Sequence, residues 1–373
     1  MPKSTSLEIQ QFHLWDKIRD KRLPLSFDLE ITARCNNDCR HCYINLPLND
    51  QAARERELSV QEISRIADQA VKLGAVWCLI TGGEPLLRPD FSDIYKLLKR
   101  KGLIVSVFTN ATLVNREHVA LFKKYPPRDI EVTVYGVTRK TYERVTRAPH
   151  TFDKFMHGLN LLIENGVRVR LKTMAIQSNY VEQAEIAAFC RAHTKDFFRF
   201  DPQLHLRFDG NQARNDEIRA ERLTPKQIIA QEQADEQRMG TLQNECKSLA
   251  EKGFTPCSCD RLFYCGAGNG SFNISYDGRF RLCSSLWAPE TVYDLRHGTL
   301  AEAWHDFVPR VREMRSTRQT LATTCRVCPL VNICLWCPAH AHLETGEIDG
   351  STSYFCSVAH ARHEALRGGR TVG

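Results

Sequence analysis

The sequence predicts an α/β fold, in which a partial (β/α)6 barrel of the TIM type is followed by a small cysteine-rich domain. Strand-like runs alternate with amphipathic helix-like segments over the first two-thirds of the chain, an order typical of parallel sheets with right-handed crossovers. About six such units occur, which suits an open barrel better than a closed barrel of eight units. Nine of the fifteen cysteines lie beyond residue 253, where the periodicity weakens, as in small domains that metal helps to fold.

Six strands are expected. Residues 25–32 alternate apolar and polar side chains, as a half-buried strand does, and residues 75–81 form the continuous apolar run of a strand buried on both faces. The remaining strands are expected at residues 103–109, 130–136, 167–176 and 197–206. A helix is expected at residues 58–74, where Ser59 and Glu62 form a capping box. The other helices are expected at residues 90–102, 115–124, 152–165 and 181–192.

The predicted elements and the composition divide the chain into four parts. These are an N-terminal extension (1–24), the barrel (25–208), a polar helical connector (209–252) and the cysteine-rich domain (253–373).

The composition favours a cytoplasmic protein whose cysteines are reduced. The N-terminus has no apolar core of signal-peptide length, and no segment approaches a membrane span. A disulfide framework suits short secreted domains rather than a chain of 373 residues, so the fifteen cysteines indicate metal binding. The net charge of +7 comes from Lys and Arg that are spread along the chain, and it indicates neither nucleic acid nor a membrane as a partner.

A three-cysteine loop directly follows the first predicted strand. Cys35, Cys39 and Cys42 stand in the run CNNDCRHC, and thiolates so close in sequence can hold three corners of a cubane cluster. A [4Fe–4S] cluster ordinarily takes four cysteines, so this loop would leave one iron open, as catalytic metal sites do. The loop also lies at the carboxyl end of a barrel strand, where barrel active sites are built. A zinc site with His41 or a distant fourth ligand is the alternative that the loop alone leaves open.

A glycine-rich run follows the second predicted strand. Residues 81–85 read TGGEP, and glycines after a strand let the backbone approach a ligand closely. This run, one βα unit after C-x3-C-x2-C, resembles the signature of the radical S-adenosylmethionine (SAM) superfamily. The resemblance implies that SAM is bound near these motifs and near the following strand ends, by His41, Gly82, Gly83, Glu84, Pro85, Asn110 and Thr133.

The resemblance also implies the cofactors and the reaction class. SAM would bind a catalytic [4Fe–4S] cluster, which would pass one electron to it, and the resulting 5′-deoxyadenosyl radical would remove a hydrogen atom from a substrate. The alternative of a different class is a non-catalytic iron–sulfur electron carrier. Such a carrier would need closed clusters and no SAM site, so the GGEP run and the three-cysteine loop count against it.

The cysteines of the last third form a second pattern. Zinc ribbons pair two C-x2-C knuckles across roughly 12–20 residues, whereas here the knuckles are five residues apart. The pattern resembles instead the SPASM extension of radical SAM enzymes, which carries two auxiliary [4Fe–4S] clusters. That resemblance assigns one cluster to Cys259, Cys265, Cys283 and Cys337. It assigns the other cluster to Cys325, Cys328, Cys334 and Cys356.

Several cysteines and histidines fall outside these assignments. Cys257 is either a substitute ligand or a free thiol, and Cys246 has no assigned role. Cys78, in an apolar strand, and Cys190, on a helix, are expected in the core. Because all eight auxiliary positions already have thiolates, the histidines of the CPAHAH run are expected to be solvated or hydrogen-bonded locally. These histidines are His340 and His342.

The resemblance further bears on the substrate. Residues 198–210, FRFDPQLHLRFDG, resemble a segment of members that modify ribosomally synthesised peptides by crosslinking, thioether formation or epimerisation. Members that mature sulfatases have an acidic residue where this chain has Ser284, so that activity is not expected. Members of haem, tetrapyrrole or other small-molecule pathways are the alternative, since haem-pathway members share the C-x2-C spacing of Cys334 and Cys337.

Three partners follow from this interpretation. A precursor peptide would be the substrate, and flavodoxin or ferredoxin would donate electrons. Only about two dozen residues precede the first predicted strand, too few for the winged-helix module with which some members grip a leader peptide. A separate leader-peptide-binding protein is therefore expected.

Overall fold

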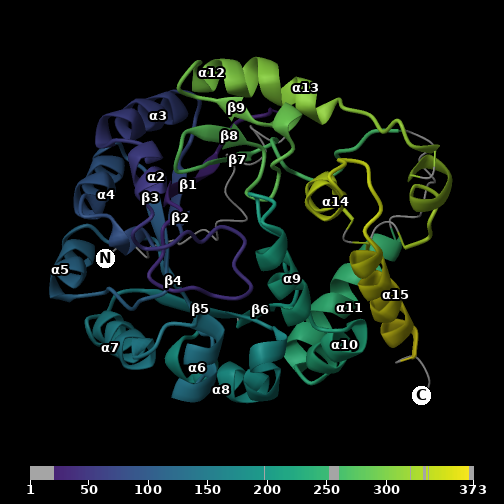
Figure 1. The fold of residues 1–373 in the computed structure, drawn as a ribbon, viewed down its shortest axis with the longest axis horizontal. Helices are drawn as coiled ribbons and strands as arrows, with labels where there is room; N and C mark the ends of the chain where they lie inside the picture. The colour runs from purple at the N-terminus through teal and green to yellow at the C-terminus, as the bar shows by residue number, and fades with distance from the viewer. Residues whose placement is uncertain are drawn as a thin grey trace, which may run out of the picture.

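The computed structural model describes residues 21–196, 198–251, 260–319, 321–330, 333–334 and 336–368. Six parallel strands lie side by side in chain order, in a curved sheet (Figure 1). They are β1 (Ser26–Thr32), β2 (Trp77–Gly82), β3 (Ile104–Thr109), β4 (Ile130–Thr133), β5 (Val169–Met174) and β6 (Arg199–Asp201). The predicted partial (β/α)6 barrel is confirmed. The last strand is shorter than predicted, because Pro202 has no N–H to continue the ladder.

Helices cover the outer side of this sheet (Figure 1). The predicted helices are α3 (Val60–Lys72), α4 (Phe91–Arg100), α5 (Arg116–Lys124), α7 (Thr151–Glu164) and α8 (Gln183–His193). The capping box of Ser59 and Glu62 begins α3, as predicted. The sequence does not predict α2 (Gln51–Arg56) or α6 (Arg139–Thr146), since both are short and half of the buried positions of α6 are threonine. Short 3₁₀ segments are η2 (Pro85–Leu87), η3 (Gln177–Glu182) and η4 (Pro289–Thr291), and short π-helical segments are η5 (Ala303–Phe307) and η6 (Leu321–Cys325).

The two faces of the sheet differ in polarity. Along β1, Phe27, Leu29 and Ile31 are buried in one apolar cluster with the helices. Asp28 and Glu30 point to the opposite face, because successive side chains of a strand alternate. The interior of the barrel is therefore polar on this strand.

Three further strands extend the sheet beyond β1. They are β7 (Ser271–Ile274), β8 (Arg279–Arg281) and β9 (Tyr293–Asp294). The turn between β7 and β8 holds Gly278 at φ +87°, a left-handed conformation that favours glycine. The fully buried Arg281 pairs with Glu30 of β1 at 2.9 Å. The cysteine-rich region thus continues the barrel sheet. The sequence does not reveal this, because these short strands have no amphipathic helices between them to mark their positions.

The polar segment before this region forms helices, as predicted. They are α9 (Gln212–Glu221), α10 (Pro225–Gln233) and α11 (Glu236–Glu251). The remaining helices are α12 (Leu300–Glu302), α13 (Val308–Arg312), α14 (Pro338–Thr345) and α15 (Ser353–Gly368). α15 packs beside α10, where Arg362 and Glu232 form a buried ion pair at 2.6 Å. Within the described part of the chain, no helix has the length and apolar character needed to cross a membrane.

Candidate active site

The cysteine loop follows β1 at the carboxyl end of the barrel strands. Its ends are tied together, because the Cys35 N–H donates to the Leu46 carbonyl at 3.0 Å and the Leu46 N–H donates to the Ala33 carbonyl at 2.8 Å. The loop therefore closes on itself immediately after the strand.

The three predicted thiols of this loop lie close together. Burial raises the pKa of Cys35, Cys39 and Cys42, and the charges of Cys42 and Cys35 raise the pKa of Cys39 further. Such repulsion is strong only between near neighbours. A cationic centre bound among the thiols would offset the cost of burying their negative charge, so this group suits metal ligation by thiolates.

The GGEP run lies against the same loop. The Gly83 N–H donates to the Thr32 carbonyl at 2.7 Å, and the Glu84 N–H donates to the Arg34 carbonyl at 2.9 Å. A Cβ atom on Gly82 would lie 2.1 Å from the Thr32 oxygen, and one on Gly83 would lie 2.3 Å from the Arg34 oxygen. Glycine is required at both positions because the two backbones approach too closely for any side chain. The contact of these glycines with SAM stays a prediction.

The Glu84 side chain joins the ends of β2 and β3. It is buried and accepts hydrogen bonds from the Leu86 N–H at 3.0 Å, the Thr109 hydroxyl at 2.8 Å and the Asn110 N–H at 2.7 Å. Burial raises the pKa of this carboxyl to about 7, although the three donors oppose the rise. Pro85, also buried, begins η2 directly afterwards. Glu84 therefore holds two strand ends together, and its contact with SAM, like that of Pro85, stays a prediction.

Asn110 connects the end of β3 to the cysteine loop. Its Nδ2 donates to Asn36 Oδ1 at 2.9 Å and lies 3.8 Å from Cys35 Sγ. Its Oδ1 accepts from the Thr112 hydroxyl at 2.6 Å, and Asn36 Nδ2 donates to that hydroxyl at 2.8 Å. The structure thus brings Asn110 to Cys35, and the contact of Asn110 with SAM stays a prediction. Sequence reasoning misses Asn36 and Thr112, because no local spacing relates residues 76 positions apart.

His41 and Thr133 lie in different surroundings. The His41 ring is buried 5.5 Å from the Tyr135 ring, and among the described residues its Nδ1 has no hydrogen-bond partner. Burial lowers the pKa of His41 to about 4, so the ring is neutral at pH 7. A buried polar atom without a partner is unfavourable, and a bound ligand could supply one. Thr133 is half-buried at the end of β4, in register with Lys172 of β5.

Three of the four cysteines predicted for the first auxiliary cluster lie near one another. Burial, followed by the charges of Cys283 and Cys265, raises the pKa of Cys337 to about 12. Cys265 also raises the pKa of Cys283, after the larger effect of burial. Cys259 and the leftover Cys257 lie outside the described residues.

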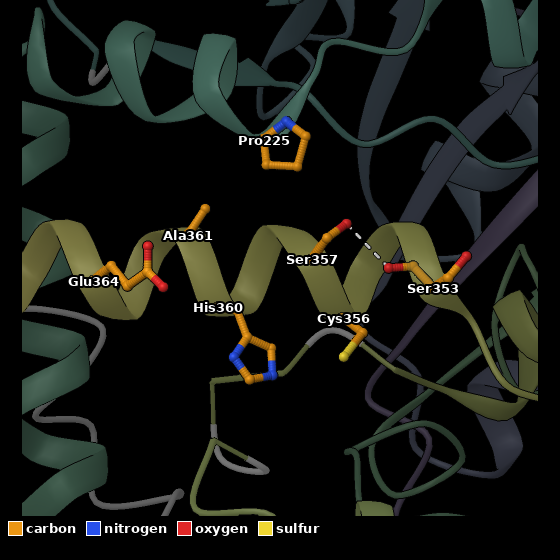
Figure 2. Close-up of a pocket in the computed structure, with 7 residues that line it drawn as sticks. All are labelled: Pro225, Ser353, Cys356, Ser357, His360, Ala361 and Glu364. Atoms are coloured by element: carbon orange, nitrogen blue, oxygen red, sulfur yellow. Dashed lines mark hydrogen bonds between the residues drawn. The ribbon is translucent and has the colours of Figure 1, made fainter.

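The four cysteines predicted for the second auxiliary cluster also lie together. Burial raises the pKa of Cys334, and the charges of the other three raise it further. Those three are Cys325, Cys328 and Cys356. Cys356 is exposed on α15, and Figure 2 shows it beside His360 on one side of the helix. The adjoining pocket of about 480 Å³ is lined by Pro225, Ser353, Cys356, Ser357, His360, Ala361 and Glu364. It contains no residue of the cysteine loop.

Of the remaining cysteines and histidines, some lie where the sequence predicts and one makes an unexpected contact. Cys78 and Cys190 are buried in the apolar core, as expected, whereas the Cys246 side chain lies outside the described part. The expectation of only local hydrogen bonds is wrong for His340, whose Nε2 lies 2.8 Å from Nδ1 of His205. The two rings meet because α14 packs against the segment after β6, a tertiary contact that sequence spacing does not reveal.

A single metal ion and an iron–sulfur cluster need different arrangements of cysteine side chains. Within the described ranges, no three or more His, Cys, Asp or Glu side chains are arranged to hold a single metal ion. In a cubane cluster each cysteine binds a different iron, so the sulfurs stand further apart than around one zinc ion.

Comparison with known sequences identifies related proteins. Residues 29–190 match the family model of the radical SAM superfamily. Fe-coproporphyrin III synthase of Methanosarcina barkeri is 24% identical over 350 residues, which are 86% of this chain and 84% of that protein. The antilisterial bacteriocin subtilosin biosynthesis protein AlbA of Bacillus subtilis is 26% identical over 272 residues, which are 70% of this chain and 55% of that protein.

Two solved structures share the fold. SuiB of Streptococcus suis bound to SAM has a TM-score of 0.66 at 15% identity, over 92% of this chain and 79% of that one. SuiB has also been solved with its precursor peptide SuiA. The protein anSMEcpe with bound SAM has a TM-score of 0.64 at 14% identity, over 92% of this chain and 93% of that one, and it has also been solved with a bound peptide. Both matches extend well beyond the barrel.

Proposed function

This chain belongs to the radical SAM superfamily, and on that premise we propose that it cleaves SAM reductively and abstracts hydrogen from a ribosomally synthesised peptide. The peptide would be crosslinked, joined through a thioether or epimerised. One observation carries the proposal: the loop whose three thiols lie together begins where β1 meets the GGEP run, and Asn110 reaches Cys35 from the end of β3. Barrel active sites are built at that end.

Cys35, Cys39 and Cys42 would hold the catalytic [4Fe–4S] cluster. When bound and reduced, the cluster supplies one electron to SAM, which yields methionine and the 5′-deoxyadenosyl radical that abstracts the hydrogen atom. The residues of the chain place and shield the reactants. Asn110 and the GGEP run hold the loop against the strand ends, and the unpartnered Nδ1 of His41 supports a place for this ring beside the adenine.

Two auxiliary [4Fe–4S] clusters would lie in the C-terminal region. The proximity of three described cysteines in one group and four in the other supports both clusters. The first would take Cys259, Cys265, Cys283 and Cys337. The second would take Cys325, Cys328, Cys334 and Cys356.

A peptide substrate is supported by the name of one similar protein and by the peptides bound in the solved structures of two others. SuiB has been solved with a precursor peptide, anSMEcpe with a peptide, and AlbA is a bacteriocin biosynthesis protein. A tetrapyrrole is the second candidate, favoured by the 86% of this chain that aligns with Fe-coproporphyrin III synthase.

The test is a direct comparison of the two substrate classes. Anaerobically reconstituted protein, given dithionite and SAM, should form 5′-deoxyadenosine. Co-expression with short open reading frames that neighbour its gene should yield a peptide that has lost hydrogen mass or has taken up deuterium at an α-carbon. Unmodified peptides together with formation or turnover of a porphyrin would move the assignment to the tetrapyrrole class. Absence of 5′-deoxyadenosine in every case would reject SAM cleavage itself.

A further inference from the structure

Three arginines from outside the cysteine loop donate hydrogen bonds to its backbone. Arg147 Nε donates to the Asp38 carbonyl at 2.8 Å, and Arg214 Nη2 donates to the Cys39 carbonyl at 3.2 Å. Arg207 Nη1 donates to the Cys42 carbonyl at 3.4 Å and to the Asn45 carbonyl at 3.1 Å. The arginines therefore engage carbonyls along the whole loop, including those of two proposed cluster ligands.

Each guanidinium is itself fixed by a carboxylate. Arg207, whose side chain is only 3% exposed, pairs with Asp209 at 2.6 Å. Arg147 and Arg214 both pair with Glu217 of α9, at 2.8 Å and 3.0 Å. They also pair with Asp38 of the loop, at 3.2 Å and 2.9 Å.

The backbone of Arg147 supports the same arrangement. This residue ends α6 at φ +50°, a left-handed conformation that is unfavourable for a side chain other than glycine and that persists only where its surroundings require it. The carbonyls of the two preceding residues accept hydrogen bonds from loop N–H groups, Thr146 from Asp38 at 2.8 Å and Val145 from Arg40 at 3.3 Å. The end of α6 thus binds the loop in two ways, because the Arg147 side chain donates a hydrogen bond to it and the two preceding carbonyls accept hydrogen bonds from it.

The charges of this network cancel. Three guanidinium groups face the three carboxylates of Asp38, Asp209 and Glu217, so the network adds no net charge beside the loop. The network therefore holds the loop by hydrogen bonds of fixed geometry. An arginine fork is needed because it can donate to a carboxylate and to a carbonyl at once, which a lysine cannot do with fixed geometry.

We propose that Arg147, Arg207 and Arg214 are positioning residues that clamp the cysteine loop in the conformation that holds the catalytic cluster. The inference rests on the proposed function, since it concerns the cluster of that site. It also gives a physical role to residues 198–210, because Arg207 and Asp209 belong to that segment. The segment after β6 thereby fixes the catalytic loop of β1, from the opposite edge of the six-stranded sheet.

The test uses Arg207→Lys and Arg214→Lys, which keep the positive charge but lose the planar set of N–H donors of the guanidinium group. Arg219→Lys is the matched control, because Arg219 also lies on α9 but donates to Asp216 at 2.9 Å rather than to the loop. Reconstituted full-length proteins are compared by iron loss to a chelator and by the part of the reduced-cluster EPR spectrum that shifts when SAM is added. A third readout is tryptic cleavage after Arg40, whose side chain is 43% exposed within the loop.

The clamp predicts a specific pattern. Loss of one charge-assisted hydrogen-bond set should speed iron loss about tenfold, broaden the SAM-sensitive EPR signal and accelerate cleavage after Arg40, while Arg219→Lys behaves like wild type. If Arg207→Lys does not fold, the less buried Arg214→Lys still gives the comparison. Lysine variants that match wild type in all three readouts would overturn the clamp. A wild-type protein without a SAM-sensitive signal would instead overturn the proposed function.

Discussion

The cysteine loop and the two C-terminal cysteine groups differ in where their thiols come from and in what surrounds them. Cys35, Cys39 and Cys42 stand within eight consecutive residues, and the backbone around them is hydrogen-bonded to strand ends. The C-terminal groups collect cysteines from segments tens of residues apart, and Cys265 and Cys356 are exposed. The polypeptide alone fixes the first site, whereas bound metal would have to tie together the segments of the others.

The largest expected effect follows from removing the loop thiols. The triple variant Cys35→Ala, Cys39→Ala and Cys42→Ala should lose about four irons and all SAM cleavage. Its far-UV circular dichroism should stay that of wild type, because the barrel and its hydrogen bonds do not depend on the cluster. Iron analysis and a chromatographic assay for 5′-deoxyadenosine measure the result. Persistent 5′-deoxyadenosine would show that these thiols do not hold the catalytic cluster.

Removing a thiol of the C-terminal region should change the fold as well as the iron content. Cys325→Ala or Cys328→Ala should also remove about four irons. In addition, the last third of the chain should become sensitive to protease, because the proposed metal binding there would be coupled to folding. Cys190→Ala is the control, since this thiol is buried in the core of the barrel. Limited proteolysis with mass spectrometry locates the cuts. Cuts in the barrel, or a resistant C-terminal region, would contradict the comparison.

The same contrast explains how much could be predicted from the sequence. The barrel strands could be predicted because they alternate with amphipathic helices, and this holds even for β4 and β6, which have four and three residues. A loop whose three cysteines lie within eight residues could be found as well. β7, β8 and β9 are short and have no such helices between them to mark their positions. The contacts of Asn36 with Thr112, and of Arg207 with Asn45, could not be predicted, because they join residues 76 and 162 positions apart. The partners of such polar side chains are set by tertiary packing rather than by spacing.

A smaller effect tests the closeness of the two backbones at the proposed catalytic site. Gly83→Ala would place a Cβ atom 2.3 Å from the Arg34 carbonyl oxygen, so the GGEP run or the cysteine loop must move. Overpacking of this kind costs about 2 kcal/mol of unfolding free energy, and SAM cleavage should fall at least tenfold. Gly240→Ala is the control, because that helical position has no atom within 4 Å of an added Cβ. It should stabilise α11 slightly, since alanine favours helix. Urea denaturation and the 5′-deoxyadenosine assay distinguish the two, and equal behaviour would mean that the close approach is not needed.

The smallest effect is a pH dependence that arises from Glu84 at the same site. Burial raises the pKa of this carboxyl to about 7 from an ordinary value near 4.5, so the folded protein keeps a proton that the unfolded chain has lost. That proton stabilises the fold at low pH, and the contribution disappears as the pH rises through 7. Between pH 6 and 8 the free energy of unfolding should fall by about 1 kcal/mol from this group alone. Glu84→Gln cannot ionise and should remove that slope, even though the variant is less stable at every pH because it loses an acceptor for Thr109 or Asn110. Urea denaturation of both proteins at pH 6, 7 and 8 measures the difference, and parallel pH profiles would show that Glu84 is ionised throughout this range.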